Sequence, residues 1–343
     1  MSAKRHDLIE RSIYRRTQGF YAVSSWLDIF YLLGPWIVGV ALLFMFPVLC
    51  GFDPYFLNIF ATSGIYAILG VSWVLLALLG LYSLGHGIYI AIPGYIIGVL
   101  NVNLHLPLYV SVALGMILGT LVIVAFHCAS LRVKGPYFLL VTFLVPLMLT
   151  QTAFLFPDLL HGEEGIFGIQ TLTYGPIPFV SGNYYLVATV VVFTLIAARR
   201  FINSKESGLI LRCVADNEYA VEASGLSVWK YKILLFTVSS IIGNIAGVLY
   251  VITKGYIGPS SFATTVSLTP LLGSVIGTIN TSLAGPVIGT YLLVVTIESL
   301  RVSAHFKIII YAVILMAAAL ARPRGLFHHM AQAYQYFRRV REQ

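Results

Sequence analysis

The chain has 343 residues, of which 59% are apolar and only 10% are charged, and its mean hydropathy is +0.89. Soluble domains typically carry about 25% charged residues, so this composition excludes an ordinary soluble protein and favours one membrane domain. The net charge of +8 does not indicate nucleic-acid binding, because the basic residues form short clusters between long apolar runs, as in membrane-protein loops. We therefore predict an all-α, polytopic transmembrane protein that contacts the lipid bilayer and binds no nucleic acid.

Apolar runs along the chain predict the transmembrane helices, because a spanning helix needs roughly 20 mostly apolar residues. Ten runs approach this length: 30–50, 57–80, 88–104, 107–127, 137–156, 184–201, 232–252, 264–280, 285–300 and 306–321. Three of them are short, and half-helices or re-entrant segments are the alternative for these: 88–104, 264–280 and 285–300. The sequence therefore predicts eight to ten spans, some of them broken.

Basic residues predict the orientation. If the ten runs are threaded in order, every Lys and Arg except Lys254, Arg301 and Lys307 falls on one side of the membrane. Because loops rich in Lys and Arg stay in the cytoplasm, we expect a multi-pass protein of the cell inner (cytoplasmic) membrane with both termini in the cytoplasm. The predicted parts are an N-terminal arm over 1–29, a transmembrane domain over 30–321 and a cytoplasmic tail over 322–343.

The stretch Gly80–Gly87 interrupts two apolar runs with three glycines, a serine and a histidine. In lipid, such a break must line a cavity or be buried in protein, because its backbone polar groups need partners. Broken helices of this kind often form transport pathways. Ser83, Gly85, His86 and Gly87 are therefore candidates for a translocation path, and an ordinary cytoplasmic turn between two spans is the alternative.

The loop 157–182 is predicted to lie on the outer side. It carries Asp158, Glu163 and Glu164 and no basic residue. Its many glycines and prolines predict turns rather than a long helix: Gly162, Gly165, Gly168, Gly175, Pro176, Pro178 and Gly182.

The loop 203–231 is predicted to lie in the cytoplasm and to contain one short helix over 211–225, with Gly225 as its stop. Glu218 and Glu222 are four residues apart, and like charges at this spacing destabilise an isolated helix by roughly a few tenths of a kcal/mol. A partner surface with basic groups would offset that repulsion. A solvated loop helix without a partner is the alternative.

Small and polar residues follow between Gly273 and Gly289. Small residues allow helices to pack closely in a membrane, which is one role for this region. Exposure to a substrate pathway is the other, and under that interpretation Thr278 and Asn280 are candidates for the translocation path.

Motifs of catalytic sites are missing. No Gly-x-x-x-x-Gly-Lys-Ser/Thr phosphate loop is present, so the chain by itself is not an ATPase. Cys50, Cys128 and Cys213 lie far apart and form no metal or redox pair motif. We predict a protein that is not an enzyme, with no catalytic residue and no metal site.

The spans are almost free of charge. An ion-driven secondary transporter usually keeps a carboxylate or histidine deep in a span, so an ATPase-independent secondary transporter or channel is disfavoured but stays an alternative.

Several segments of the chain resemble, in the same order, the ABC-transporter permeases for branched-chain amino acids, the LivM-like subunits of the binding-protein-dependent transport inner-membrane component family. These segments are Ser83-Leu84-Gly85-His86; Gly135-Pro136-Tyr137-Phe138 followed by Val141-Thr142; Gly162-Glu163-Glu164-Gly165-Ile166; the run from Leu211 to Lys232; Ala246-Gly247-Val248-Leu249-Tyr250; Pro259-Ser260-Ser261-Phe262; Gly285-Pro286-Val287-Ile288-Gly289; and Arg322-Pro323-Arg324-Gly325-Leu326. Together they extend from about 57 to 326.

This resemblance implies a permease subunit of an ATP-driven importer. The implied partners are a second permease subunit, two ABC ATPase subunits and a periplasmic or external solute-binding protein. The chain itself would hold no cofactor, since ATP and magnesium are used by the partner ATPase subunits. The implied substrates are branched-chain (hydrophobic) amino acids, and the same family includes permeases for urea and short-chain amides as an alternative.

The resemblance also implies roles for two loops. The loop 203–231 would be the ATPase-coupling loop, with these contact candidates: Arg212, Asp216, Asn217, Glu218, Glu222, Ala223 and Gly225. The outer loop would meet the binding protein through Gly162, Glu163, Glu164 and Gly165. Two departures from the family pattern concern the substrate: Thr278 and Asn280 stand where paired glycines are usual, and Leu81 and Tyr82 stand where a glutamine is common.

Overall fold

The computed structural model describes residues 26–131, 133, 136–204, 206–277, 283–299, 306, 309–313 and 316. The predicted C-terminal tail, most of the predicted N-terminal arm, Thr278 and Asn280 lie outside these residues. The chain forms two compact units, Met1–Gly51 and Phe52–Gln343. The first unit contains helix α2 (Trp26–Leu49).

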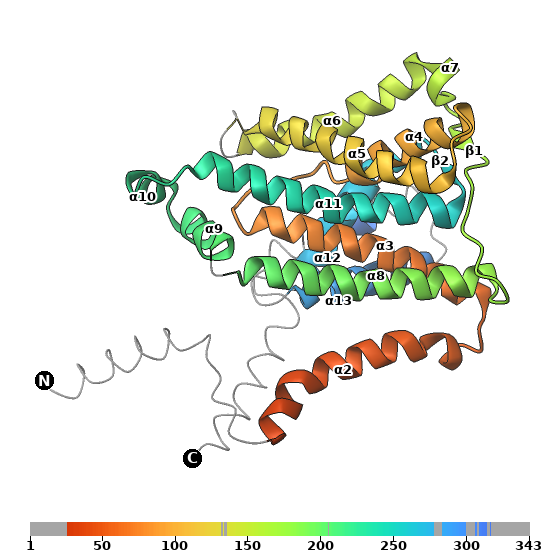
Figure 1. Cartoon of the computed structure of the whole chain (residues 1–343), viewed down its shortest axis with the longest axis horizontal. Helices are drawn as coiled ribbons and strands as arrows, with labels where there is room; N and C mark the ends of the chain where they lie inside the picture. The colour runs from red at the N-terminus through yellow and green to blue at the C-terminus, as the bar shows by residue number, and fades with distance from the viewer. Residues whose placement is uncertain are drawn as a thin grey trace, which may run out of the picture. The chain divides into compact units, whose positions relative to one another are not determined.

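The second unit is a helical bundle (Figure 1). Its helices are α3 (Pro54–Ala77), α4 (Ile88–Gly98), α5 (Leu108–Ser130), α6 (Pro136–Leu155), α7 (Pro157–Leu160), α8 (Phe179–Ile202), α9 (Ser207–Asp216), α10 (Glu218–Ala223), α11 (Val228–Lys254), α12 (Thr264–Ile276) and α13 (Ala284–Ser299). A π-helical segment, η1 (Val99–Asn103), continues α4, and a 3₁₀ turn, η2 (Pro259–Phe262), precedes α12. Two short strands, β1 (Ile166–Phe167) and β2 (Tyr256–Ile257), pair antiparallel with Ile166 opposite Ile257.

Five of the described helices are long and apolar enough to cross a membrane: α3, α5, α6 from Tyr137 onward, α8 and α11. Shorter apolar helices cover Trp36–Leu49, Ile88–Asn103, Thr264–Ile276 and Ala284–Ser299. The predicted class, an all-α polytopic protein, is therefore confirmed. The runs predicted to be short are short, since α12 has 13 residues and α13 has 16. The total number of crossings stays a prediction.

Helices α3 and α11 form the centre of the bundle. In their spanning windows 83% and 72% of the residues are buried, against 22% for α5 and α6 and 28% for α8. Helix α3 packs against α8, α11, α12 and α13, and α4 packs against α5 and α11. The peripheral helices expose large apolar side chains such as Ile117 and Met148, which is the surface that lipid would cover.

Polar pairs join the two central helices. The Ser72 hydroxyl donates to the Ser239 carbonyl, and the Ser239 hydroxyl donates to the Ser72 carbonyl, both at 3.0 Å. Both serines are fully buried. Interhelical hydrogen bonds of this type contribute to helix association where no hydrophobic driving force acts.

Close packing accounts for the described glycines between Gly273 and Gly289. A Cβ on Gly289 would collide with the carbonyl oxygen of Gly273, and a Cβ on Gly277 would collide with that of Gly285. The packing role predicted for this region is therefore present between α12 and α13. The exposure of Thr278 and Asn280 to a pathway stays a prediction.

Candidate functional site

The break between α3 and α4 descends from the surface into the bundle. Gly80 and Tyr82 are exposed, whereas Ser83 and His86 are 1% and 0% exposed. Helix α4 then begins inside the protein, packed against α5 and α11. Ser83, Gly85, His86 and Gly87 are therefore buried in protein, and their role in a translocation path stays a prediction.

Side chains from three helices satisfy the backbone of this break. The Trp73 indole of α3 donates to the Ser83 carbonyl at 2.8 Å. The Leu84 amide donates to Thr142 Oγ1 of α6 at 3.2 Å, and the Gly87 amide donates to Ser267 Oγ of α12 at 2.9 Å. Because an unpaired backbone group inside a membrane protein costs several kcal/mol, these contacts allow a non-helical segment to exist at this depth.

Gly85 lies where the break passes closest to α6. A Cβ at this position would collide with the backbone carbonyl oxygen of Thr142. The obstacle is backbone rather than a flexible side chain, so α6 would have to move to admit a larger residue. The break and α6 are therefore closely packed through Gly85 and Thr142.

His86 is the one histidine of the break. Its ring stacks on Tyr89 with centroids 4.6 Å apart. Neither of its ring nitrogens has a hydrogen-bond partner among the described residues. The neighbouring Tyr89 belongs to a short hydrogen-bond chain. Its hydroxyl lies 3.3 Å from His127 Nε2, and His127 Nδ1 lies 2.9 Å from the Ile123 carbonyl. Donation from Nδ1 to that carbonyl leaves Nε2 as acceptor for the Tyr89 hydroxyl.

The loop 203–231 forms two helices rather than the single helix predicted over 211–225. Helix α9 ends at Asp216, Asn217 is extended with φ −161° and ψ 103°, and α10 follows. The Asn217 side chain accepts from the Ala220 amide at 3.2 Å and so caps α10. Asparagine is a preferred N-cap residue, and this local hydrogen bond competes with continuation of the helix.

Ionic contacts in this loop are made within the chain. Glu218 pairs with Lys232 of α11 at 2.6 Å. Arg212 donates to Asn203 Oδ1 at 2.9 Å. Lys232 of the same chain therefore offsets the charge of Glu218. Glu222, the other member of the acidic pair, is exposed.

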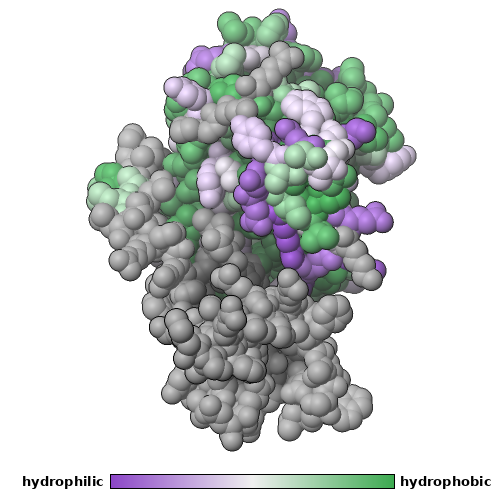
Figure 2. All heavy atoms as spheres, turned by 90° about the vertical axis from the view of Figure 1, so that its left-hand side faces the viewer, coloured by the Kyte–Doolittle hydropathy of each residue, from purple (hydrophilic) through white to green (hydrophobic). Residues whose placement is uncertain are grey.

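The remaining coupling-loop candidates form an accessible surface. Arg212, Asp216, Asn217, Glu222, Ala223 and Gly225 are exposed, and Glu218 is half-buried. Leu211, Val214 and Val221 face inward and hold the two short helices on the bundle. Figure 2 looks onto the end of the molecule that carries α9 and α10, where hydrophilic side chains gather among hydrophobic ones.

A groove separates this loop from the end of α3, just before the break. It has a volume of about 280 Å³ and lies between the end of α3, α8, α9 and α11. Leu78 and Leu79, which follow directly after α3, line it together with Leu211, Arg212 and Asp216 of α9. Residues of α9 and the residues that precede the break thus line one groove.

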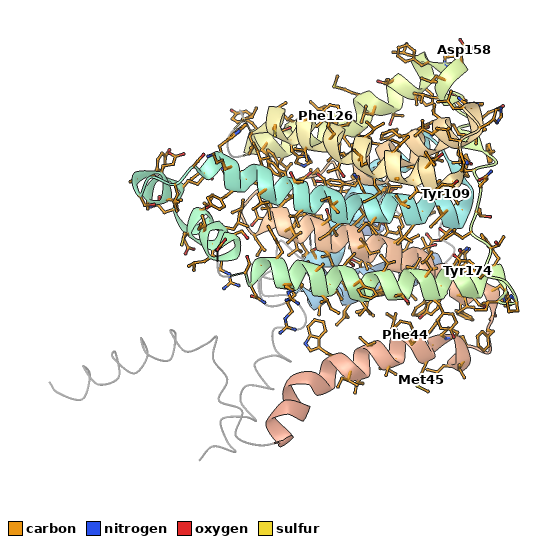
Figure 3. The ribbon with its side chains drawn as sticks, viewed as in Figure 1. Phe44, Met45, Tyr109, Phe126, Asp158 and Tyr174 are labelled. Atoms are coloured by element: carbon orange, nitrogen blue, oxygen red, sulfur yellow. The ribbon has the colours of Figure 1, made fainter. Side chains whose placement is uncertain are left out.

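The outer loop is held at the opposite end of the second unit from α9 and α10 (Figure 3). Turns follow the predicted glycines, with positive φ at Gly162, Gly165, Gly168 and Gly175. Pairing of β1 with β2 and donation from the Gln170 amide to Asn101 Oδ1 at 2.9 Å anchor the loop. Glu163 and Glu164 are exposed, whereas Gly162 and Gly165 are buried.

The break and both loops are predictable from the sequence, whereas the residues that hold them are not. Ser267 is not among the predicted residues, and Lys232 is predicted only as a cytoplasmic charge and as the end of the resembling run, because the partner of each lies on another element. Thr142 was noted only as part of a resemblance. Serine and threonine inside apolar runs are the signal that could have indicated hydroxyl partners for a broken segment.

The sequence profile of the family described as "Branched-chain amino acid transport system / permease component" matches residues 55–319. The chain belongs to this family. The match includes the break, the loop with α9 and α10, and the outer loop, which together make up the three candidate sites. This ABC permease is accordingly a multi-pass membrane protein and a transport subunit rather than an enzyme, and permeases of this family carry no cofactor.

Curated relatives of the permease agree with this assignment. It is 26% identical to the high-affinity branched-chain amino acid transport system permease protein LivM of Salmonella typhimurium over 300 residues, which is 76% of this chain and 67% of the relative. It is 25% identical to LivM of Escherichia coli over 292 residues, with the same coverage. A probable LivM of Methanocaldococcus jannaschii is 31% identical over 152 residues, 42% of this chain and 41% of the relative. No solved structure matches the chain significantly.

Proposed function

We propose that the chain is the permease subunit of an ATP-binding-cassette importer for branched-chain or other hydrophobic amino acids. The observation that carries this proposal is the broken segment between α3 and α4, which holds no Asp, Glu, Lys or Arg and enters the interior of a bundle that matches a transport family. A path without fixed charge suits a zwitterion with an apolar side chain. The names of the matched relatives support the same substrate class.

The charge distribution supports an orientation with α9 and α10 in the cytoplasm. Arg199, Arg200, Arg212, Lys230 and Lys232 gather at that end of the described bundle. The exposed acidic pair Glu163 and Glu164 lies between α7 and β1, at the other end (Figure 1). Under the positive-inside rule, the outer loop would then face the side where substrate arrives, in the inner membrane of the cell.

The proposed partners follow from these two ends. Two ABC ATPase subunits would bind the exposed residues of α9 and α10, and an external solute-binding protein would bind around Glu163 and Glu164. A second permease subunit would complete the path. ATP and magnesium would be held by the ATPase subunits.

The proposed mechanism links ATP to the break through α9. Closure of the ATPase dimer would displace α9 and α10. Leu211 and Asp216 of α9 line one groove with Leu78 and Leu79. The displacement would pass across this groove to the segment that enters the break. Ser83, Gly85, His86 and Gly87, with Thr278 and Asn280, are the residues proposed to line the path.

Reconstitution tests this proposal. Proteoliposomes that contain the permease with its ATPase subunits and binding protein should accumulate labelled leucine only when ATP is enclosed with the ATPases. Labelled urea, offered in parallel, should not accumulate. Uptake of urea instead of leucine would assign the short-chain amide branch of the family, and uptake by the permease alone, abolished by collapsing an ion gradient, would assign a secondary transporter.

A further inference from the structure

A basic groove lies at the end of α8. It is lined by Ile196, Arg199, Arg200, Asn203 and Ser204 and has a volume of about 570 Å³. Both arginines are exposed, and they occupy the last turn of a helix that is long and apolar enough to span the membrane. The groove therefore lies where a spanning helix leaves the apolar layer.

An apolar strip leads along α8 to this groove. Phe193 and Ile196 are 67% and 55% exposed, and Ala197 beside them is exposed as well. Phe193, Ile196 or Ala197, and Arg200 follow the spacing that places residues on one helix face. A ligand on this face would thus meet hydrocarbon-compatible side chains first and a guanidinium group at the end.

The floor of the groove also positions α9. Ser204 Oγ accepts from the Gly208 amide at 2.8 Å, and Asn203 Oδ1 accepts from Arg212 at 2.9 Å. Asn203 and Ser204 therefore line the groove and also hold the beginning and the middle of α9. An anion seated in the groove would bear directly on the turn that sets the position of α9.

We propose that this groove binds the headgroup of an anionic phospholipid, whose acyl chain lies along Phe193 and Ile196, and that the bound lipid stabilises the position of α9. The guanidinium fork matches phosphate oxygens bidentately, and basic pockets at the cytoplasmic side of transmembrane helices attract acidic lipids. The leaflet and the effect on coupling rest on the orientation and the importer proposed above, whereas lipid binding itself does not. Arginines in a last helical turn also complement the helix dipole, and that role would show no preference among lipids.

Native mass spectrometry of the full chain in detergent tests the binding. The probes are phosphatidylglycerol and phosphatidylcholine with the same acyl chains, and the variants are Arg200→Gln and Lys230→Gln. Lys230 is an exposed basic residue near the same end, in the first turn of α11 and outside the groove. We expect the wild type and Lys230→Gln to retain phosphatidylglycerol over phosphatidylcholine, and Arg200→Gln to weaken that retention roughly tenfold, as expected for the loss of a hydrogen bond to a charged group.

Three results would overturn the proposal. These are equal retention of the two lipids, an equal loss in Arg200→Gln and Lys230→Gln, and displacement of phosphatidylglycerol by excess inorganic phosphate, which would indicate an anion site without a lipid requirement. Ile196→Ser tests the apolar strip along α8 and should lower lipid retention. Unchanged retention would count against the acyl-chain contact. Because this readout needs no transport, selective lipid retention in a preparation that fails to import leucine would contradict the importer alone.

Discussion

Single hydroxyl groups decide whether the broken segment between α3 and α4 is tolerated. The amide of Gly87 has Ser267 Oγ as its acceptor, and the amide of Leu84 has Thr142 Oγ1. Both acceptors belong to helices far away in the chain. Removing one of them leaves a buried donor unpaired, and the resulting loss of stability comes from that donor rather than from the hydroxyl itself.

Ser267→Ala is therefore expected to lower the free energy of unfolding by about 1–3 kcal/mol. Ser274→Ala is the matched control, because Ser274 is also buried in α12 but its hydroxyl donates to the Pro270 carbonyl of its own helix. Thermal unfolding of the two variants in the same detergent measures the difference. Equal melting temperatures would contradict the role given to Ser267.

Substitution of His86 distinguishes a structural role of this side chain from a role in transport. Its ring is fully buried and its nitrogens have no hydrogen-bond partner among the described residues. An apolar ring of similar shape removes unpaired polar atoms, so His86→Phe should leave the melting temperature unchanged or raise it. If the break lines the path, the same variant should lose leucine uptake in proteoliposomes. Retention of wild-type uptake would remove His86 from the path.

At the scale of elements, α9 and α10 are oriented by contacts with the bundle as well as by their own sequence. The pair between Glu218 and Lys232 ties α10 to α11. The Glu218 side chain is 43% exposed, and pairs near the surface contribute at most about 1 kcal/mol. The pair between Glu218 and Lys232 therefore matters more for the position of α10 than for the free energy of unfolding.

Glu218→Lys should abolish association with the ATPase subunits, because two lysines would then face each other at this contact. The double variant Glu218→Lys with Lys232→Glu restores the intramolecular pair and should recover association in a co-purification assay. Glu222→Lys, on the exposed face, should lose association without recovery by Lys232→Glu. If the swapped pair stays defective, Glu218 contacts the partner directly and the intramolecular pair is secondary.

At the scale of the whole molecule, the two ends of the bundle differ in their basic residues. Among the described Lys and Arg residues, only Lys254 lies at the end with β1 and β2, where the exposed acidic loop is, and the others gather at the end with α9 and α10 (Figure 1). Under the positive-inside rule, this difference predicts the orientation of the bundle. Its direction in the membrane is open to direct measurement.

Cysteine labelling measures that direction. Cys213 is exposed on α9, so a variant that keeps only this cysteine should react with a membrane-impermeant maleimide after permeabilisation of spheroplasts and not before. A second variant, with all three native cysteines replaced and Glu163→Cys added, should react in intact spheroplasts. The reverse pattern would invert the proposed orientation and, with it, the assignment of both partner surfaces.

The class of the protein and the approximate position of its helices could be predicted from the sequence. Length and apolar content act locally or as sums along the chain, so hydropathy indicated the long helices α3, α5, α6, α8 and α11, and glycines indicated the break at Gly80–Gly87. Local turn chemistry also indicated the outer loop, where glycines adopt positive φ as predicted. The single helix over 211–225 was wrong, because an asparagine cap inside a helix-compatible stretch interrupts it at Asn217.

Tertiary structure alone decided how those parts work together. The burial of His86, the hydroxyl partners of the break and the pairing of Glu218 with Lys232 all depend on residues brought together by folding, such as Gly87 and Ser267, which are 180 positions apart. Such contacts leave no periodic or compositional trace in one sequence. The chain thus determines by composition that it crosses a membrane, whereas packing of distant helices determines that its broken segment is buried rather than exposed.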